Sequence, residues 1–271
     1  MVDQAQGVRE IINHKLTPIP RLIAVTSGKG GVGKTNVSVN LALALINYNQ
    51  KVALLDADLG LANADIILGV YPRYTLMDVF NGTKKLDEIV INGPLGLKII
   101  AGSSGVYELA TMDPLALGRL IDSAIHLDQF LDFLIVDTSA GLNRNVVQFA
   151  LALDEILVVA TSEPSSIADA YGLVKTILHR EPDKQIAVVA NMVRSPNEGL
   201  LVWQKLNLMT TNFLQRELKY AGSVLYDKRV ADAVKEQQPF ILAYPGCSAS
   251  RSIRSVAWNL LTQTEHGAAS K

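Results

Sequence analysis

The stretch LIAVTSGKGGVGKT at residues 22–35 contains the signal that decides the fold. It begins with a short apolar run, Leu22–Thr26, which predicts a buried strand. Residues 28–35 then fit the pattern G-x-x-x-x-G-K-S/T, and a helix is expected to follow at Thr35–Ile46. In such a loop, backbone N–H groups turn inward around phosphate oxygens, and the helix N-terminus adds partial positive charge. The stretch therefore predicts a phosphate-binding loop between a strand and a helix.

The side chains of this loop predict a nucleotide site with a magnesium ion. We expect the Lys34 ammonium to reach the β- and γ-phosphates, and the Thr35 hydroxyl to lie on Mg²⁺. A glycine-rich turn that binds nothing is the alternative. The loop residues expected to contact the nucleotide are Gly28, Lys29, Gly30, Gly31, Val32, Gly33, Lys34 and Thr35.

Short apolar runs recur along the rest of the chain, separated by segments of helical period. Most of these runs are apolar throughout rather than alternating, which is typical of strands buried on both faces of a parallel sheet. Strands that alternate with helices predict an α/β fold, a doubly wound, mostly parallel sheet with helices on both faces. The runs are Val52–Asp56, Leu97–Ala101, Phe133–Asp137, Ile156–Thr161, Ile186–Asn191 and Ser223–Leu225.

The N-terminal residues differ from this pattern. Asp3 and Gln6 have the spacing of a capping box, which predicts the start of a short helix. Pro18 and Pro20 then stop a helix and keep the chain extended. A disordered leader, or a helix folded back on the core, is the alternative. The apolar residues expected on one face of this helix are Ala5, Val8, Ile11 and Ile12.

Composition limits the class of protein. The chain has 271 residues, and 25 Lys and Arg against 26 Asp and Glu give a net charge of −1, so direct nucleic-acid binding is not expected. Its single cysteine, Cys247, cannot form an internal disulfide or hold a zinc or iron–sulfur site alone. The N-terminus does not read as a secretory signal, which predicts a cytoplasmic protein. We expect one domain over residues 21–271, after a helix and linker over residues 1–20.

The loop KGGVGKT at residues 29–35 resembles that of the deviant Walker A ATPases, the MinD/ParA family of P-loop NTPases. In that family the first lysine reaches across a dimer interface to the nucleotide of the other subunit. The resemblance implies an ATPase that converts ATP and water to ADP and phosphate and forms an ATP-dependent homodimer. It implies catalytic roles for Lys29 and Lys34, with Lys29 on the dimer face.

Two further segments resemble the switch regions of the same family: LLDADLGLAN at residues 54–63 and IVDTSAG at residues 135–141. The resemblance implies that Asp58 positions or activates the attacking water, a third catalytic role. A helix cap or a loop position is the alternative for any one of these aspartates. The residues implied at the metal are Thr35, Asp56 and Asp137.

Two asparagines complete the site that the resemblance implies. Asn63 would face the partner subunit, on the dimer face. Asn191, at the end of a predicted strand, would hydrogen-bond the edge of adenine, because a carboxamide both donates and accepts. A turn-forming asparagine is the alternative at this position.

Three stretches are similar to the FlhG/FleN branch of the family, whose members set flagellar number and placement: KTNVSVNLA at 34–42, EPSSIADAY at 163–171 and DQAQGVR at 3–9. The last is similar to the D-Q-A-x-x-L-R segment with which these proteins stimulate the FlhF GTPase. The branch implies action at the cell pole with an FlhF-type GTPase, basal-body proteins and, in some members, a FleQ-type transcription factor. The residues implied to contact the GTPase are Asp3, Gln4, Ala5, Val8 and Arg9.

The last predicted helix bears on membrane association. Its apolar face is expected to cover the sheet, which leaves only weak or conditional binding at the inner face of the cytoplasmic membrane. A MinD-type division-site ATPase and a ParA-type partitioning ATPase are the alternative functions, and a small-molecule ligase on the same fold is also open. An iron-protein reductase would need more cysteines. The residues of the apolar face are Ile253, Val256, Ala257, Leu260 and Leu261.

Overall fold

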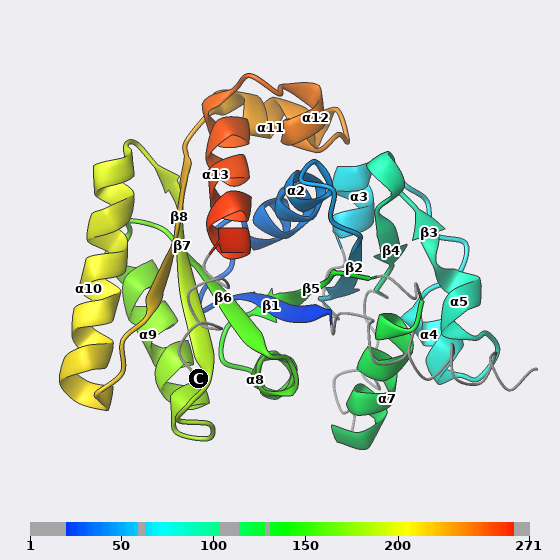
Figure 1. The fold of residues 1–271 in the computed structure, drawn as a ribbon, viewed down its shortest axis with the longest axis horizontal. Coiled ribbons are helices and arrows are strands. Elements are labelled where there is room, and N and C mark those ends of the chain that lie inside the picture. Colours follow the sequence, from blue (N-terminus) through cyan, green and yellow to red (C-terminus); the bar gives the residue numbers. More distant parts are fainter. Residues whose placement is uncertain (1–19, 59–62, 103–113, 128–130, 263–271) are drawn as a thin grey trace, which may run out of the picture.

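The structure is a computed structural model that describes residues 20–58, 63–102, 114–127 and 131–262. Its centre is an eight-stranded sheet in the order β3-β4-β2-β5-β1-β6-β7-β8 (Figure 1). Neighbouring strands are parallel except for the antiparallel pair of β3 and β4, which confirms the predicted fold class. The strands are β1 Arg21–Ser27, β2 Val52–Ala57, β3 Ile91–Asn92, β4 Lys98–Ile100, β5 Phe133–Ala140, β6 Glu155–Ala160, β7 Gln185–Val193 and β8 Lys219–Leu225.

Each apolar run that predicted a strand overlaps a strand, although the ends differ; Leu97–Ala101, for example, is longer than β4 at both ends. The last strand was expected at Ser223–Leu225 but begins at Lys219. The sequence did not indicate its first half, because Lys219 and Gly222 interrupt the apolar pattern. Strand β3 was not predicted, since two residues are too few for a periodic signal.

Helices cover both faces of the sheet. The first group packs in one hydrophobic cluster: α4 Leu76–Phe80, α5 Leu86–Ile89, α7 Pro114–Ile125, α8 Arg144–Ala152, α9 Pro164–Leu178 and α10 Pro196–Leu214. The second packs in the other cluster: α2 Lys34–Ile46, α3 Ala64–Leu68, α11 Lys228–Lys235, α12 Phe240–Ala243 and α13 Ser248–Thr262. A short 3₁₀ turn, η1 Pro94–Gly96, joins β3 to β4.

Strand β1 shows how the two clusters meet. Leu22 and Ala24 belong to the first cluster, whereas Ile23 and Val25 belong to the second. Alternate side chains of one strand thus enter opposite cores, and both faces need apolar residues, which explains the continuous apolar runs.

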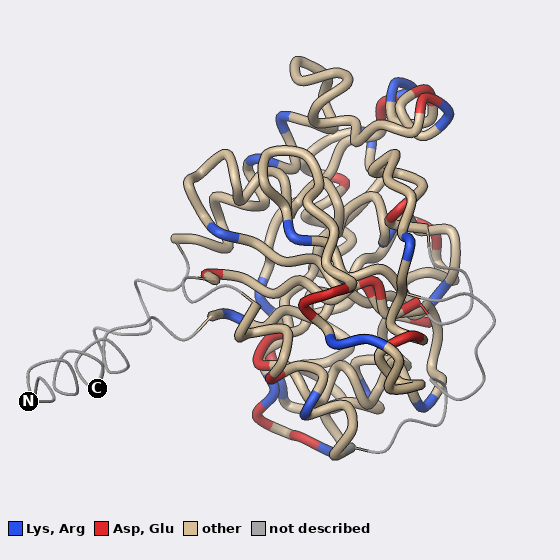
Figure 2. Tube along the Cα trace, turned by 90° about the vertical axis from the view of Figure 1, so that its right-hand side faces the viewer, with Lys and Arg blue, Asp and Glu red and all other residues tan. Residues whose placement is uncertain are grey.

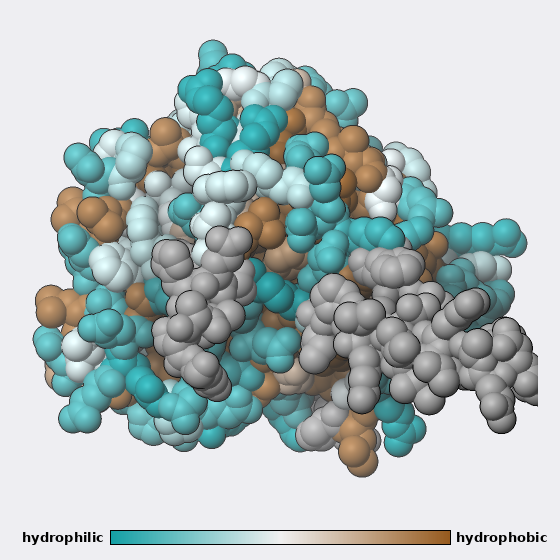
Figure 3. All heavy atoms as spheres, viewed as in Figure 1, coloured by the Kyte–Doolittle hydropathy of each residue, from teal (hydrophilic) through white to brown (hydrophobic). Residues whose placement is uncertain are grey.

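Helix α13 packs with its apolar face on the sheet, as expected. Ile253, Val256 and Leu260 are buried, and α13 lies against β8 and α2. No helix within the described ranges is long and apolar enough to cross a membrane. On the face shown in Figure 3, hydrophobic residues form small groups among hydrophilic ones.

Basic and acidic positions are interspersed along the described trace (Figure 2). This distribution agrees with the near-zero net charge of −1. The predicted helix and the GTPase-contact residues fall within residues 1–19, and part of the first switch-like segment falls within residues 59–62; both lie outside the described residues.

Candidate nucleotide-binding site

The glycine-rich loop connects the carboxyl end of β1 to α2. Strand β1 lies between β5 and β6, so the loop emerges beside the carboxyl ends of both. In open parallel sheets, ligands bind outside the carboxyl ends of the strands. The fold therefore places the predicted phosphate loop where such a sheet binds its ligand.

Two glycines of the loop are required by close backbone contacts. Gly33 has φ +81°, and a Cβ there would lie 2.5 Å from Asn191 Nδ2. A Cβ on Gly28 would lie 2.2 Å from the backbone carbon of Asp169. Any side chain at either position would push the loop away from β7 or α9, so glycine is needed for its shape.

Asn191 fastens the loop to β7. Its Nδ2 donates to the Val32 carbonyl oxygen at 2.7 Å, and the side chain is buried. The structure thus gives Asn191 a contact that sequence reasoning did not foresee, holding the nucleotide loop in place. The predicted contact with adenine stays a prediction.

Lys34 and Asp137 form a buried ion pair at the first turn of α2. Lys34 Nζ lies 2.8 Å from Asp137 Oδ1, and the two side chains are 6% and 0% exposed. Ser38 Oγ donates to the same carboxylate oxygen at 2.7 Å. Ser38 was not predicted, although it lies one helical turn after Lys34 and therefore on the same side of α2.

Asp56 is the second buried carboxylate of the site. It lies one residue before the end of β2, directly beside Asp137, with which it is paired in register. Its oxygens accept the backbone N–H groups of Asp58 at 3.0 Å and of Asn63 and Ala64 at 3.1 Å. Burial, and then the neighbouring Asp137 charge, raise the pKa of Asp56 to about 7. Two buried carboxylates thus lie side by side, and Lys34 pairs with one of them, Asp137.

These residues fit a magnesium ion. Asp137 Oδ2 is buried without a hydrogen-bond partner, so one ligand oxygen is available. The Thr35 hydroxyl lies 3.5 Å from Lys34 Nζ and supplies another hard oxygen nearby. No cluster of three His, Cys, Asp or Glu groups that could hold a metal occurs among the described residues. Mg²⁺ commonly takes few protein ligands and completes its shell with phosphate and water.

Lys29 pairs within its own subunit. Its Nζ lies 2.7 Å from Glu163 Oε2 and 3.0 Å from Ser165 Oγ, at the start of α9. The Lys29 side chain is 39% exposed, and Asn63 is also exposed. Glu163 was not predicted as a site residue, because no local signal connects it with a lysine 134 positions away.

The structure therefore brings most of the predicted site together. The loop at residues 28–35, with Asp56, Asp58 and Asp137, occupies the carboxyl ends of β1, β2 and β5, and Asn191 approaches from β7. The fold and this arrangement define a P-loop nucleotide-binding protein.

Comparison with known proteins narrows the class. Residues 23–240 match the model of the CobQ/CobB/MinD/ParA nucleotide binding domain. The chain belongs to this MinD/ParA family.

Two similar proteins indicate which branch of this family the chain resembles. The chain is 44% identical over 237 residues to the antiactivator FleN of Pseudomonas aeruginosa, covering 88% of this chain and 85% of the relative. It is 35% identical over 258 residues to the flagellum site-determining protein YlxH of Helicobacter pylori, covering 92% and 84%. Both relatives support the predicted branch.

A solved structure agrees with the fold. The septum site-determining protein MinD of Pyrococcus horikoshii, complexed with Mg-ADP, is similar with a TM-score of 0.75 at 25% identity, covering 90% of this chain and 97% of that chain.

Proposed function

We propose that this protein is a magnesium-dependent ATPase that dimerises with ATP and regulates flagellar number and placement. The observation that carries the proposal is the pair of buried carboxylates, Asp56 and Asp137, with Lys34 at the nucleotide loop. Similarity to the flagellum site-determining protein YlxH, and to the antiactivator FleN, whose branch the sequence resembles, supports the regulatory part. The proposed location is the cytoplasm and the cell pole, with weak or conditional contact to the inner face of the membrane.

The geometry suggests what each residue does. Lys34 lies against Asp137, and we propose that it turns to the β- and γ-phosphates when nucleotide binds. Thr35, Asp56 and Asp137 would hold Mg²⁺ and its waters, and the ion would supply charge for the developing phosphate oxygens. Asp58 would position the attacking water.

Lys29 would connect hydrolysis to assembly. In the single subunit it is held by Glu163, an exposed partner that it can leave at little cost. We propose that Lys29 swings across to the nucleotide of a second subunit, as in the family, and that Asn63 lies on the same face. The ATP-bound dimer and the ADP-bound monomer are then the two states of the switch.

Light scattering of three proteins in ATP and in ADP tests this assignment. The wild-type protein should dimerise in ATP and be monomeric in ADP. Lys29→Ala should bind nucleotide but stay monomeric, because the charge supplied across the interface is removed. Asp58→Ala should dimerise in ATP and remain dimeric without phosphate release, since only water activation is lost.

Two results would contradict it. If Asp58→Ala is monomeric in ATP, Asp58 serves assembly and not water. If Lys29→Ala dimerises and hydrolyses ATP normally, Lys29 only serves its own subunit through Glu163.

We propose further that residues 3–12 activate an FlhF-type GTPase. A synthetic peptide of residues 1–16 should raise GTP hydrolysis by FlhF, and Arg9→Ala or Gln4→Ala should reduce the effect. Micromolar affinity is expected, because so short a segment loses conformational entropy when it binds. Turnover is measured by phosphate release, with a scrambled peptide as control.

An inert peptide would favour the second candidate, a MinD-type division-site ATPase, which the MinD-like fold supports. A ParA-type partitioning ATPase would bind DNA with strong salt dependence, which a gel shift at two salt concentrations would show. A FleQ-type transcription factor and basal-body proteins are the further partners that we propose for the flagellar role.

A further inference from the structure

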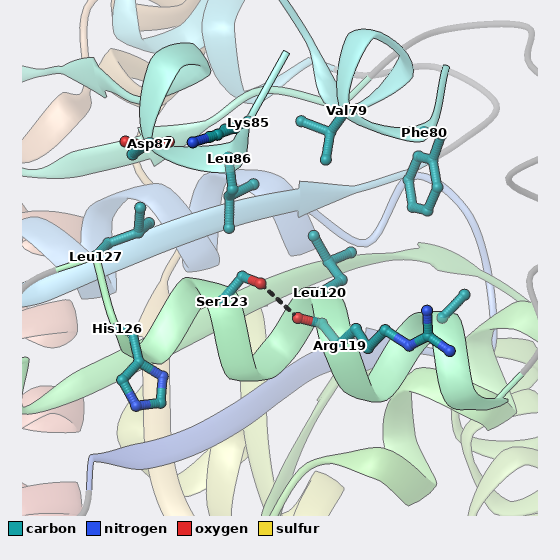
Figure 4. A pocket seen from close by; sticks show the side chains of 11 residues that line it. Val79, Phe80, Lys85, Leu86, Asp87, Arg119, Leu120, Ser123, His126 and Leu127 are labelled. Atoms are coloured by element: carbon teal, nitrogen blue, oxygen red, sulfur yellow. Dashed lines mark hydrogen bonds between the residues drawn. The ribbon is translucent and has the colours of Figure 1, made fainter. Parts of the chain in front are cut away.

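A groove of about 890 Å³ lies between α7 and the segment that contains α4 and α5 (Figure 4). Its floor is apolar: Leu86 and Leu120 are buried and point toward each other, with Val79 and Phe80 beside them. Its rim is charged or polar, formed by Lys85, Asp87, Arg119, Ser123 and His126. The groove thus has the build of a site for an amphipathic segment.

Opposite charges mark its two ends. In Figure 4, Asp87 lies toward the end formed by Leu127, and the Arg119 guanidinium lies toward the end formed by Phe80. Asp87 and Arg119 are both exposed, and neither forms an ion pair within the described part of the chain. An occupant with a basic residue near Asp87 and an acidic residue near Arg119 would form an ion pair at each end of the groove.

The Leu127 end is five residues along the chain from Asp132, which lies beside the point where residues 1–19 join the domain. The Arg21 backbone N–H donates to the Asp132 carbonyl at 2.9 Å. Five residue steps separate Leu127 from Asp132, and they span at most about 18 Å. Nine steps separate Ile12 from Arg21 and span up to about 32 Å, so the linker reaches the groove.

We propose that this groove docks residues 3–12 of the same chain. The apolar face expected for that segment matches the apolar floor. Because the linker enters at the Leu127 end, Ile12 lies there and Asp3 lies at the far end, about 14 Å away in a helix. This direction brings Arg9 toward Asp87 and Asp3 toward Arg119, so both unpaired charges of the groove gain a partner.

Docking and GTPase contact would exclude each other, because they use the same face of residues 3–12. This consequence rests on the proposed function, whereas docking itself rests on the groove and the linker. Docking would then withhold the activating segment until the groove releases it.

Cross-linking of the full chain tests the docking directly. Val8→Cys is labelled with benzophenone maleimide; Cys247 is fully buried, so the wild-type chain serves as the unlabelled blank. After irradiation, peptide mapping should find cross-links within one chain to α7 and to residues 79–87. The yield should not change on tenfold dilution.

Two sets of variants make the result specific. Ser123→Trp fills the groove from an exposed position and should lower the yield at least tenfold. Ser255→Trp is the matched control, since Ser255 is also exposed and its hydroxyl donates to the carbonyl four residues earlier, as that of Ser123 does. Arg9→Asp should lower the yield about two- to fivefold, and Asp87→Arg in the same chain should restore it.

Cross-links elsewhere, no cross-links, or cross-links that Ser123→Trp leaves unchanged would overturn the proposal. A yield that falls with dilution would assign the groove to a second copy and would also overturn it. None of these cross-linking measurements involves the GTPase. A peptide that fails to stimulate the GTPase would therefore not affect the test of docking.

Discussion

Asn191 holds the glycine-rich loop through a single side-chain hydrogen bond. Its amide nitrogen is committed to the Val32 carbonyl at 2.7 Å. Removing it leaves that carbonyl without its buried donor and loosens the loop that would hold the phosphates.

We therefore expect Asn191→Ala to weaken binding of ATP and GTP together, by about tenfold, the effect of one buried hydrogen bond. Calorimetric titration with both nucleotides measures this. A loss confined to ATP would instead support the predicted contact with adenine.

Lys29 shows where residue-level prediction ends. The loop pattern alone indicated Lys34, Thr35 and the glycines, because a phosphate loop is a local structure. The contact between Lys29 and Glu163 joins two loops far apart in sequence, and only the pairing of β1 with β6 brings them together. No pattern within either segment contains that information.

At the scale of the element, the cap of α11 gives a testable pH dependence. Asp227 is the N-cap of α11; its carboxylate accepts from Arg229 and from the Ser248 N–H, which ties α11 to the start of α13. The hydrogen bond from the Arg229 side chain, with the backbone N–H groups of Arg229 and Ser248, holds the pKa of Asp227 well below its usual range.

Asp227→Asn should lower the free energy of unfolding at pH 7 by about 1–2 kcal/mol, the cost of a lost cap and a charged hydrogen bond. The folded-state pKa is depressed, so this stability is present above the unfolded pKa and is lost as pH falls. The difference between the two proteins should therefore narrow below about pH 4.

Urea unfolding at pH 7, 5 and 3.5 measures the difference. Asp232→Asn, on the same helix, is the control and should change stability by less than about 0.5 kcal/mol. A difference that grows in acid would contradict the assignment.

The sequence predicts the long helices and strands better than the short ones. Strands with continuous apolar runs, such as β2 and β6, were found because burial on both faces leaves a signal in composition. The short helices α3, α4 and α5 and the strand β3 are too short for a period, and their positions depend on the sheet they pack against.

At the scale of the molecule, nucleotide binding should stabilise the whole fold, because the loop joins strands and helices of both cores. Mg-ATP at a hundred times its Kd should raise the free energy of unfolding by about 2.7 kcal/mol. Lys34→Ala should abolish this gain. It should also destabilise the nucleotide-free protein by about 3 kcal/mol, because it leaves the buried Asp137 charge without its lysine counter-charge.

Urea unfolding with and without Mg-ATP measures both effects, with Lys175→Ala, an exposed lysine of α9, as the control. An equal gain in Lys34→Ala and the wild-type protein would show that Lys34 does not bind the phosphates.

The position of β1 in the sheet has a consequence for synthesis on the ribosome. Arg21 pairs with Phe133, and Ile23 with Glu155, so the strand that bears the nucleotide loop is made long before either neighbour. At about 5–20 residues per second, an apolar strand waits many seconds for a partner, a period in which chaperones have access to it. Asn191, which closes on Val32, emerges later still. The loop takes its shape only when most of the chain has left the ribosome. Nucleotide binding can therefore stabilise the folded protein but cannot assist the early steps of folding.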